Sequence, residues 1–162
     1  MELLREATAG GHKVLLFSQF TSMLDLVRER LQAEKIPYYI LQGSTKKEER
    51  ASLVDAFNTD STPVFLISLK AGGTGLNLVG ADMVIHYDPW WNLAAQNQAT
   101  DRAHRIGQTK PLQVVRLVAR DTIEDKILQL QESKWQLAQA VVSDVGPALT
   151  DLSVEELLSL LE

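Results

Sequence analysis

Short apolar runs alternate along the chain with longer stretches in which apolar residues recur every three or four positions. Five of the runs are rich in β-branched and aliphatic residues, and we expect strands at 14–18, 38–41, 64–68, 83–87 and 113–118. Strands that are covered on both faces are apolar throughout. Their alternation with helical stretches is typical of βαβ units around a parallel sheet. The pattern therefore predicts an α/β fold with an open, mainly parallel sheet.

Polar residues at the starts of the helical stretches predict where these helices begin. Ser22 with Asp25 has the spacing of a helix cap, and Thr45 with Glu48 forms a capping-box pattern. A third helix is expected at 91–104, which lacks Pro and Gly and carries four alanines. A fourth, capped at Asp121, follows the last strand.

We expect one folded unit over residues 1–145, with a core at 13–120 and a brace helix at 122–143. Gly146 and Pro147 break that helix. Residues 146–162 are predicted to add a short leucine-rich helix, beginning at Ser153, that docks on this unit or on a partner. The start of the chain, which enters a strand by residue 14, favours a fragment of a longer polypeptide.

Composition narrows the possible functions. The chain has no cysteine, and its three histidines show no metal-ligand spacing, so we expect neither a disulfide framework nor a metal centre. Its apolar runs are far shorter than the roughly 20 residues that span a bilayer, which favours an intracellular protein without a membrane partner. The net charge of −5 argues against non-specific attraction to nucleic acid.

A glycine-rich segment at 68–75 follows the third predicted strand, where ligands gather in open α/β sheets. Gly73 and Gly75 allow close approach of backbone N–H groups to an anion, and the flanking side chains that add donors are Ser68, Lys70 and Thr74. The alternative is that the glycines only permit a tight turn. The chain lacks the phosphate-loop and dinucleotide fingerprints, so it lacks the parts for NTP hydrolysis of its own.

The segment 98–105 places four polar side chains near one helix face, at spacings of three and four: Gln98, Asp101, Arg102 and Arg105. Two guanidiniums that match phosphate oxygens are what an arginine-finger role requires. The alternative is a solvated helix face on which Asp101 pairs with Arg105.

Four sequence motifs resemble those of Swi/Snf-family ATPases. Asp101-Arg-Ala-His-Arg-Ile-Gly-Gln108, preceded by Asp88-Pro-Trp-Trp-Asn92, resembles the last helicase motif of that family. The resemblance extends in order over residues 13 to 130 and includes Leu15-Leu-Phe-Ser-Gln-Phe20, Gln42-Gly-Ser-Thr45 with Arg50, and the segment 68–78. The bacterial or archaeal type of the family is expected. Two departures, Leu69 for threonine and Leu93 for proline, remove no charged site residue.

The resemblance implies the second, C-terminal RecA-like lobe of an ATP-dependent DNA translocase, with a three-layer α/β/α fold. In such proteins two lobes sandwich ATP, and the first lobe holds most of the Mg²⁺ site. The resemblance implies Arg105 as the arginine finger, Arg102 as a second phosphate contact and Gln98 as a polar link across the cleft. It also implies further nucleotide contacts at Gly73, Gly75 and Asp101. The isolated chain is expected not to hydrolyse ATP.

The resemblance implies contacts with the backbone of double-stranded DNA at five positions: Ser44, Thr45, Ser68, Lys70 and Thr74. The implied partners are an N-terminal RecA-like lobe of the same polypeptide and the DNA-bound protein that is remodelled. A cytoplasmic location is expected, on the nucleoid if the source is bacterial. Two alternatives stay open from the residues: a non-catalytic module that docks DNA or protein, and an independent nucleotide-binding enzyme. Trp90 and Trp91 are either stacking residues or structural anchors.

Overall fold

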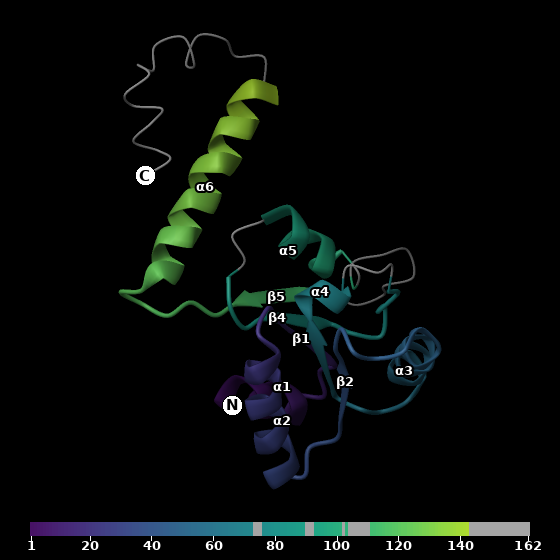
Figure 1. The fold of residues 1–162 in the computed structure, drawn as a ribbon. Helices are drawn as coiled ribbons and strands as arrows, with labels where there is room; N and C mark the ends of the chain where they lie inside the picture. Colours follow the sequence, from purple (N-terminus) through teal and green to yellow (C-terminus); the bar gives the residue numbers. More distant parts are fainter. Residues whose placement is uncertain (73–75, 90–92, 102, 104–110, 143–162) are drawn as a thin grey trace.

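The fold is taken from a computed structural model, which describes residues 1–72, 76–89, 93–101, 103 and 111–142 (Figure 1). Five strands form one sheet in the order β2-β3-β1-β4-β5, and every neighbouring pair is parallel. The strands are β1 (Val14–Ser18), β2 (Tyr38–Leu41), β3 (Val64–Ser68), β4 (Met83–His86) and β5 (Gln113–Arg116). The predicted α/β fold with an open parallel sheet is confirmed, although β4 and β5 end earlier than predicted.

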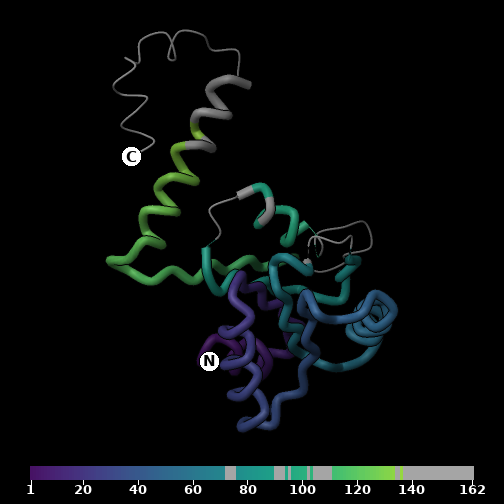
Figure 2. Tube along the Cα trace, in the orientation of Figure 1, coloured from purple at the N-terminus to yellow at the C-terminus, as the bar shows by residue number. Residues whose placement is uncertain are grey.

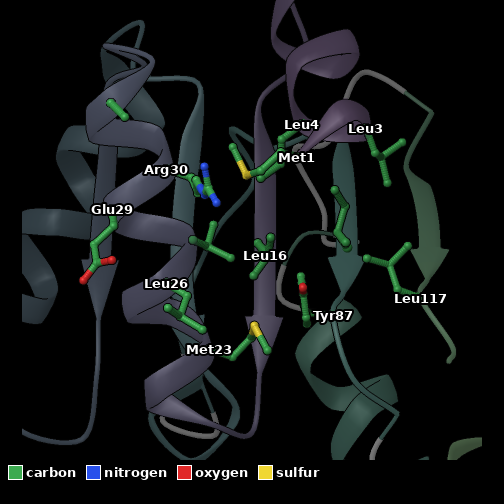
Figure 3. Close-up of a pocket in the computed structure, with 13 residues that line it drawn as sticks. Met1, Leu3, Leu4, Leu16, Met23, Leu26, Glu29, Arg30, Tyr87 and Leu117 are labelled. Atoms are coloured by element: carbon green, nitrogen blue, oxygen red, sulfur yellow. The ribbon is translucent and has the colours of Figure 1, made fainter. Parts of the chain in front are cut away.

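Helices cover both faces of the sheet, giving three layers. On one face α1 (Glu2–Ala9) and α2 (Thr21–Ala33) bury leucines against the aliphatic side chains of β1, β3 and β4. Leu4 of α1 and Leu16 of β1 line a pocket on this face (Figure 3). On the other face lie α3 (Lys47–Thr59), the short α4 (Leu69–Gly72) and α5 (Leu93–Thr100). Their buried side chains include Phe57, Ala71 and Ala99.

The long helix α6 (Ile123–Val142) follows β5 and extends away from the sheet (Figures 1 and 2). The residue that caps it is Thr122 instead of the expected Asp121, because the Glu124 N–H donates to the Thr122 hydroxyl oxygen at 3.1 Å. Two carboxylates of the first turn accept bonds from the preceding segment. Glu124 accepts from the Ala119 N–H at 2.7 Å, and Asp125 accepts from the Asp121 N–H. A helix is therefore present over the described residues of the predicted brace, whereas its bracing role stays a prediction.

Two other predicted caps are wrong. The residue before α2 is Phe20, whose side chain makes no cap bond, so the helix begins ahead of Ser22. The residue before α3 is Lys46, and the Thr45 hydroxyl oxygen instead accepts from the Gln42 N–H at 3.0 Å. In both places a hydroxyl with the right spacing was available, but the backbone entered the helix at a different residue.

The pattern also missed two helices. The first is α1, although its buried Leu4 and Ala7 stand three positions apart, and the second is α4, which occupies the first part of the predicted glycine-rich loop. Of the helix expected at 91–104, the structure describes α5 and a turn at Asp101 and Ala103. The leucine-rich helix expected within 146–162 lies outside the described residues.

Candidate functional site

The candidate site lies at the carboxyl ends of the strands. The strand order reverses at β1, with β3 and β2 on one side and β4 and β5 on the other. A crevice outside the strand ends at such a reversal is where open α/β sheets bind ligands. Ser18 and Ser68 end β1 and β3 in matched register, and Asp88 follows β4 by two residues. These three polar residues are buried beneath that edge.

Asp88 joins the ends of β1 and β4. Its Oδ2 accepts a hydrogen bond from the Ser18 hydroxyl, and its Oδ1 accepts from the Gln19 N–H at 2.9 Å. Burial raises the pKa of the Asp88 carboxyl, and the two hydrogen bonds oppose that rise by favouring the charged form. Because both oxygens are held, the connection from β1 to α2 is fixed to the end of β4. Sequence reasoning assigned no role to Asp88, although an aspartate directly after an apolar strand is a signal for one.

Ser68 and Lys70 lie where β3 passes into α4. The Ser68 hydroxyl oxygen accepts from the Ala71 N–H at 3.3 Å, and the Ser68 side chain is buried, whereas Lys70 is exposed. Gly73, Thr74 and Gly75 lie outside the described residues. Leu76 and Leu78 are buried in the core on the α3 side of the sheet.

The loop at 42–45, which joins β2 to α3, is held by a single arginine. The Arg50 guanidinium donates to the backbone carbonyls of Thr45 at 2.9 Å, Gly43 at 3.0 Å and Gln42 at 3.3 Å. Ser44 is exposed at the tip of this loop. Arg50 was part of the sequence resemblance but was given no role there. Its position within the first turn of α3, beside a polar loop, is the signal that could have found it.

A cavity of about 580 Å³ separates α3 from the segment that follows the glycines. Its lining includes Thr45 and Arg50 from one side and Leu76 and Asn77 from the other. Asn58 of α3 donates to the Asn77 carbonyl at 2.8 Å, which fixes that segment to the helix. The loop at 42–45 and the end of the glycine-rich segment therefore face one another.

Gln98 on α5 and Asp101 directly after it are exposed, while Ala99 and Ala103 are buried in the core. Arg102 and Arg105 lie outside the described residues, so the polar face that joins all four residues stays a prediction. The end of the helix is held from below by His86 of β4, whose Nε2 lies 2.9 Å from the Thr100 hydroxyl oxygen.

The fold brings the two groups of predicted site residues onto neighbouring elements. β2 and β3 are neighbours, so Ser44 and Thr45 lie at a strand end adjacent to the one that carries Ser68 and Lys70. Gln98 belongs to α5 and Asp101 follows it directly, and α5 packs against α4, the helix that contains Lys70. The residues expected to contact DNA and the described residues expected to face the nucleotide therefore lie close to one another at this edge.

The described part of the chain holds neither a metal-binding cluster nor a membrane-spanning helix. Over those residues, no three His, Asp or Glu side chains gather into a metal-binding cluster. None of the helices described there combines the length and the apolar character that crossing a bilayer requires.

Comparison with known proteins decides which family these features represent. The profile of the helicase conserved C-terminal domain matches residues 1–107. The chain belongs to this helicase C-terminal domain family. The crystal structure of the C-terminal part of the Fun30 ATPase domain superposes with a TM-score of 0.75 at 42% identity, covering 79% of this chain and 42% of that one. The RecA-like fold implied by the sequence is thereby confirmed.

Curated relatives of this helicase C-terminal domain include bacterial and fungal proteins. An uncharacterized ATP-dependent helicase of Mycoplasma pneumoniae is 44% identical over the whole of this chain and 16% of its own length. The ATP-dependent helicase rhp16 of Schizosaccharomyces pombe is 47% identical over 90% of this chain and 17% of its own length. The chromatin-remodeling ATPase INO80 of Cryptococcus neoformans is 49% identical over 86% of this chain and 8% of its own length. The resemblance to the C-terminal lobe of Swi/Snf-type ATPases is confirmed, and the chain spans less than a fifth of these relatives.

Proposed function

We propose that this chain is the second motor lobe of an ATP-dependent translocase that moves along double-stranded DNA. The observation that carries the proposal is the exposure of Gln98 on α5 and of Asp101 in the turn that follows it, within a helicase C-terminal domain. Asp88 holds the adjoining end of β4 against β1, so this end of the sheet is preorganised. The partner in this proposal is an N-terminal RecA-like lobe that binds ATP and Mg²⁺.

In this proposal the lobe supplies arginines to ATP bound on the other lobe. Arg105 is the arginine finger and Arg102 the second phosphate contact, both carried by the segment that continues from α5. A guanidinium remains charged and matches phosphate oxygens in pairs, so it stabilises charge that develops during phosphoryl transfer. Gln98 is the polar link across the cleft. The nucleotide contacts that complete the site are Gly73, Gly75 and Asp101.

The DNA surface in this proposal is the pair of adjacent strand ends at β2 and β3. The Thr45 hydroxyl oxygen accepts from the Gln42 N–H, which leaves the hydroxyl proton available to a phosphate oxygen. Ser68 is buried beneath this surface, where its oxygen accepts from the Ala71 N–H, and in this proposal it supports the strand end that Lys70 follows. Lys70 and Ser44 are exposed beside them, and Thr74 follows in the chain. Contacts of this kind position a duplex without reading its sequence, which suits a motor that moves along any DNA.

The wider biological setting is also part of the proposal. Relatives of this chain are named as chromatin-remodelling ATPases, which supports a DNA-bound protein as the object that is displaced. Residues 1–145 are proposed as the lobe with its brace helix and 146–162 as an extension. An intracellular site of action, wherever the cell keeps its DNA, follows from the proposed DNA partner.

The test is DNA-stimulated ATP hydrolysis by the chain alone and by the chain joined to an N-terminal RecA-like lobe of the same polypeptide or of a close relative. We expect hydrolysis only in the joined protein, because this chain lacks a phosphate loop. Arg105→Ala in the joined protein should lower kcat on the order of 10³-fold. Arg105→Lys is the matched control for charge, and it should remain strongly impaired because an ammonium cannot bind two phosphate oxygens in parallel.

Three results would contradict the proposal. Hydrolysis by the isolated chain would indicate a complete nucleotide site of its own. Full activity of the joined Arg105→Ala protein would remove the finger role. DNA binding without any hydrolysis in the joined wild-type protein would favour the non-catalytic docking module.

A further inference from the structure

His86, at the end of β4, is a buried histidine that the proposed motor mechanism leaves without a role. Its side chain is 1% exposed. On one side the imidazole stacks on Phe17 of β1, with ring centroids 5.7 Å apart and planes inclined by 21°. On the other side its Nε2 lies 2.9 Å from the Thr100 hydroxyl oxygen at the end of α5. The ring therefore bridges the sheet and the helix that presents Gln98 and Asp101.

A second hydrogen bond favours one direction for this contact. The Thr100 hydroxyl donates to the backbone carbonyl of Gln96 at 3.3 Å, one helical turn earlier. A hydroxyl has one proton, so with that proton on Gln96 its oxygen accepts from the Nε2–H of the His86 tautomer that is protonated at Nε2. The two bonds form a relay from the imidazole through the hydroxyl to the helix backbone. The ring atom Nδ1 has no hydrogen-bond partner among the described residues, which agrees with an unprotonated Nδ1.

The residue held by this relay lies at the point where α5 ends. Thr100 is the last residue of the helix, and the Asp101 and Ala103 N–H groups bond back to the carbonyls of Asn97 and Thr100 at 2.8 and 3.0 Å. Gln98 and Asp101 flank Thr100 on the exposed side. The buried apolar side chains described at this end of the helix are those of Ala99 and, just after it, Ala103, which bury little surface and do not resist rotation about the helix axis, and the polar Gln96 is buried beside them. The polar relay supplies the directional contact that the alanines lack.

We propose that His86 is a positioning residue that fixes the rotation and height of the last turn of α5 on the end of β4. That this turn faces ATP rests on the proposed function, whereas the hold of His86 on the turn does not. A turn set by one directional bond presents Gln98 and Asp101 in a single arrangement. Small displacements of groups that stabilise a transition state are costly, on the order of 100-fold in rate for about 1 Å.

The first experiment measures steady-state ATP hydrolysis by the two-lobed protein. His86→Leu and Thr100→Val each remove the relay while keeping side-chain volume, and each should lower kcat on the order of 10-fold with the KM for ATP within about twofold. His86→Gln and Thr100→Ser should recover most of kcat. The glutamine amide nitrogen reaches about as far as the imidazole Nε2 and donates a hydrogen bond, and serine retains the hydroxyl.

A matched control is available in α3. The Thr59 hydroxyl donates to the Asp55 carbonyl at 2.8 Å, the same bond to the preceding turn that Thr100 makes, and no histidine is bonded to it by any contact described. Thr59→Val therefore removes an equivalent bond without touching a relay, and it should leave kcat unchanged. A loss of kcat in Thr59→Val equal to that in Thr100→Val would overturn the positioning role.

The second experiment uses amide hydrogen exchange in the same protein and does not depend on turnover. In His86→Leu we expect exchange at Asp101 and Ala103 to accelerate by about 10-fold, while β1 and β3 amides keep wild-type rates, because local opening is separable from global unfolding. Unchanged exchange at these two amides would overturn the inference, as would equal acceleration in the strands. A wild-type two-lobed protein without ATPase activity would instead refute the proposed function and leave the exchange result to decide the hold of His86.

Discussion

The Arg50 guanidinium donates a hydrogen bond to the Thr45 backbone carbonyl at 2.9 Å, and the same group reaches two further carbonyls of that loop. An arginine has five donors in a fixed planar arrangement, so one side chain can satisfy several carbonyls at once. The loop proposed to contact DNA therefore takes its shape from a residue of α3, five positions further along the chain. A loop shaped in this way does not need to be ordered by its ligand.

Replacing Arg50 should weaken DNA binding without removing a DNA contact. Arg50→Lys retains the charge but cannot reach three carbonyls, so we expect a loss of stability of about 1–2 kcal/mol and weaker duplex binding by roughly 10-fold. Chemical unfolding and fluorescence anisotropy measure the two effects. Arg28→Lys, at an exposed pair with Asp25 within α2, is the matched control and should change stability by less than about 0.5 kcal/mol. Equal effects in both variants would contradict the role of Arg50.

Lys70 is predicted to contribute a single phosphate contact. Lys70→Ala should weaken binding similarly for duplexes of any sequence and should lower the slope of log affinity against log salt by about 1. A titration at several salt concentrations gives that slope. An unchanged slope would remove Lys70 from the DNA surface.

Lys35 provides a stability prediction and the control for Lys70. It follows α2 with φ of 56°, the left-handed region, and the Lys35 and Ile36 N–H groups bond back to Gln32 and Leu31 at 3.1 and 2.9 Å. Glycine adopts this conformation without steric cost, so Lys35→Gly should raise the free energy of unfolding by about 0.5–1 kcal/mol. The same variant removes a lysine near the amino end of β2, away from the carboxyl ends of the strands. It should leave the slope of log affinity for DNA against log salt unchanged. Destabilisation would show that the lysine side chain itself stabilises the fold.

Asp88 should be intolerant of truncation. Asp88→Ala leaves the Gln19 N–H and the Ser18 hydroxyl without their buried acceptor, at a cost of about 2–4 kcal/mol. Asp88→Asn should cost less, because its carbonyl oxygen still accepts from Gln19 while its amide donates to the Ser18 oxygen. Thermal unfolding of both variants checks the order. If the two variants lost equal stability, the hydrogen bonds would not be the source.

The stability of the protein should fall in mild acid through His86. Burial, with the nearby Arg116 charge adding to it, lowers the pKa of His86 to about 4 from an ordinary value of 6.5. The His86 side chain therefore takes up a proton near pH 6.5 in the unfolded chain but only near pH 4 in the folded protein. The stability that depends on a neutral His86 is complete above pH 6.5 and is lost as the pH falls toward 4. Its size is about 3 kcal/mol. In urea titrations across this range, His86→Leu should lack this component.

The sequence predicted what depends on local pattern. The strands were found because apolar runs such as Val64–Ser68 are buried on both faces, and the exposure of Gln98 and Asp101 followed from helical spacing. The bond between Ser18 and Asp88, and that between His86 and Thr100, could not be predicted in the same way. Each joins two elements, and their meeting depends on strand order and register.

The errors at helix starts have a different cause. Thr45 had the spacing of a cap, but Arg50 draws the loop carbonyls toward itself and Thr45 bonds within that loop. The preference of Thr45 for a helix cap was outweighed by the hydrogen bonds that Arg50 of α3 makes to the loop. The same competition explains why Arg50 was recognisable as part of a motif before its structural role was visible.

The first strand of the chain lies in the middle of the sheet, and this order has a consequence for synthesis. Among the strands that the structure describes, β1 pairs with β3 and β4, and β2 pairs with β3, so the hydrogen bonds of the sheet begin to form only once β3, at residues 64–68, has been made. Until then β1 and β2 have no strand to pair with, which slows folding and exposes the nascent chain to aggregation. Newly made copies should therefore depend on chaperones during translation more than their size alone would suggest.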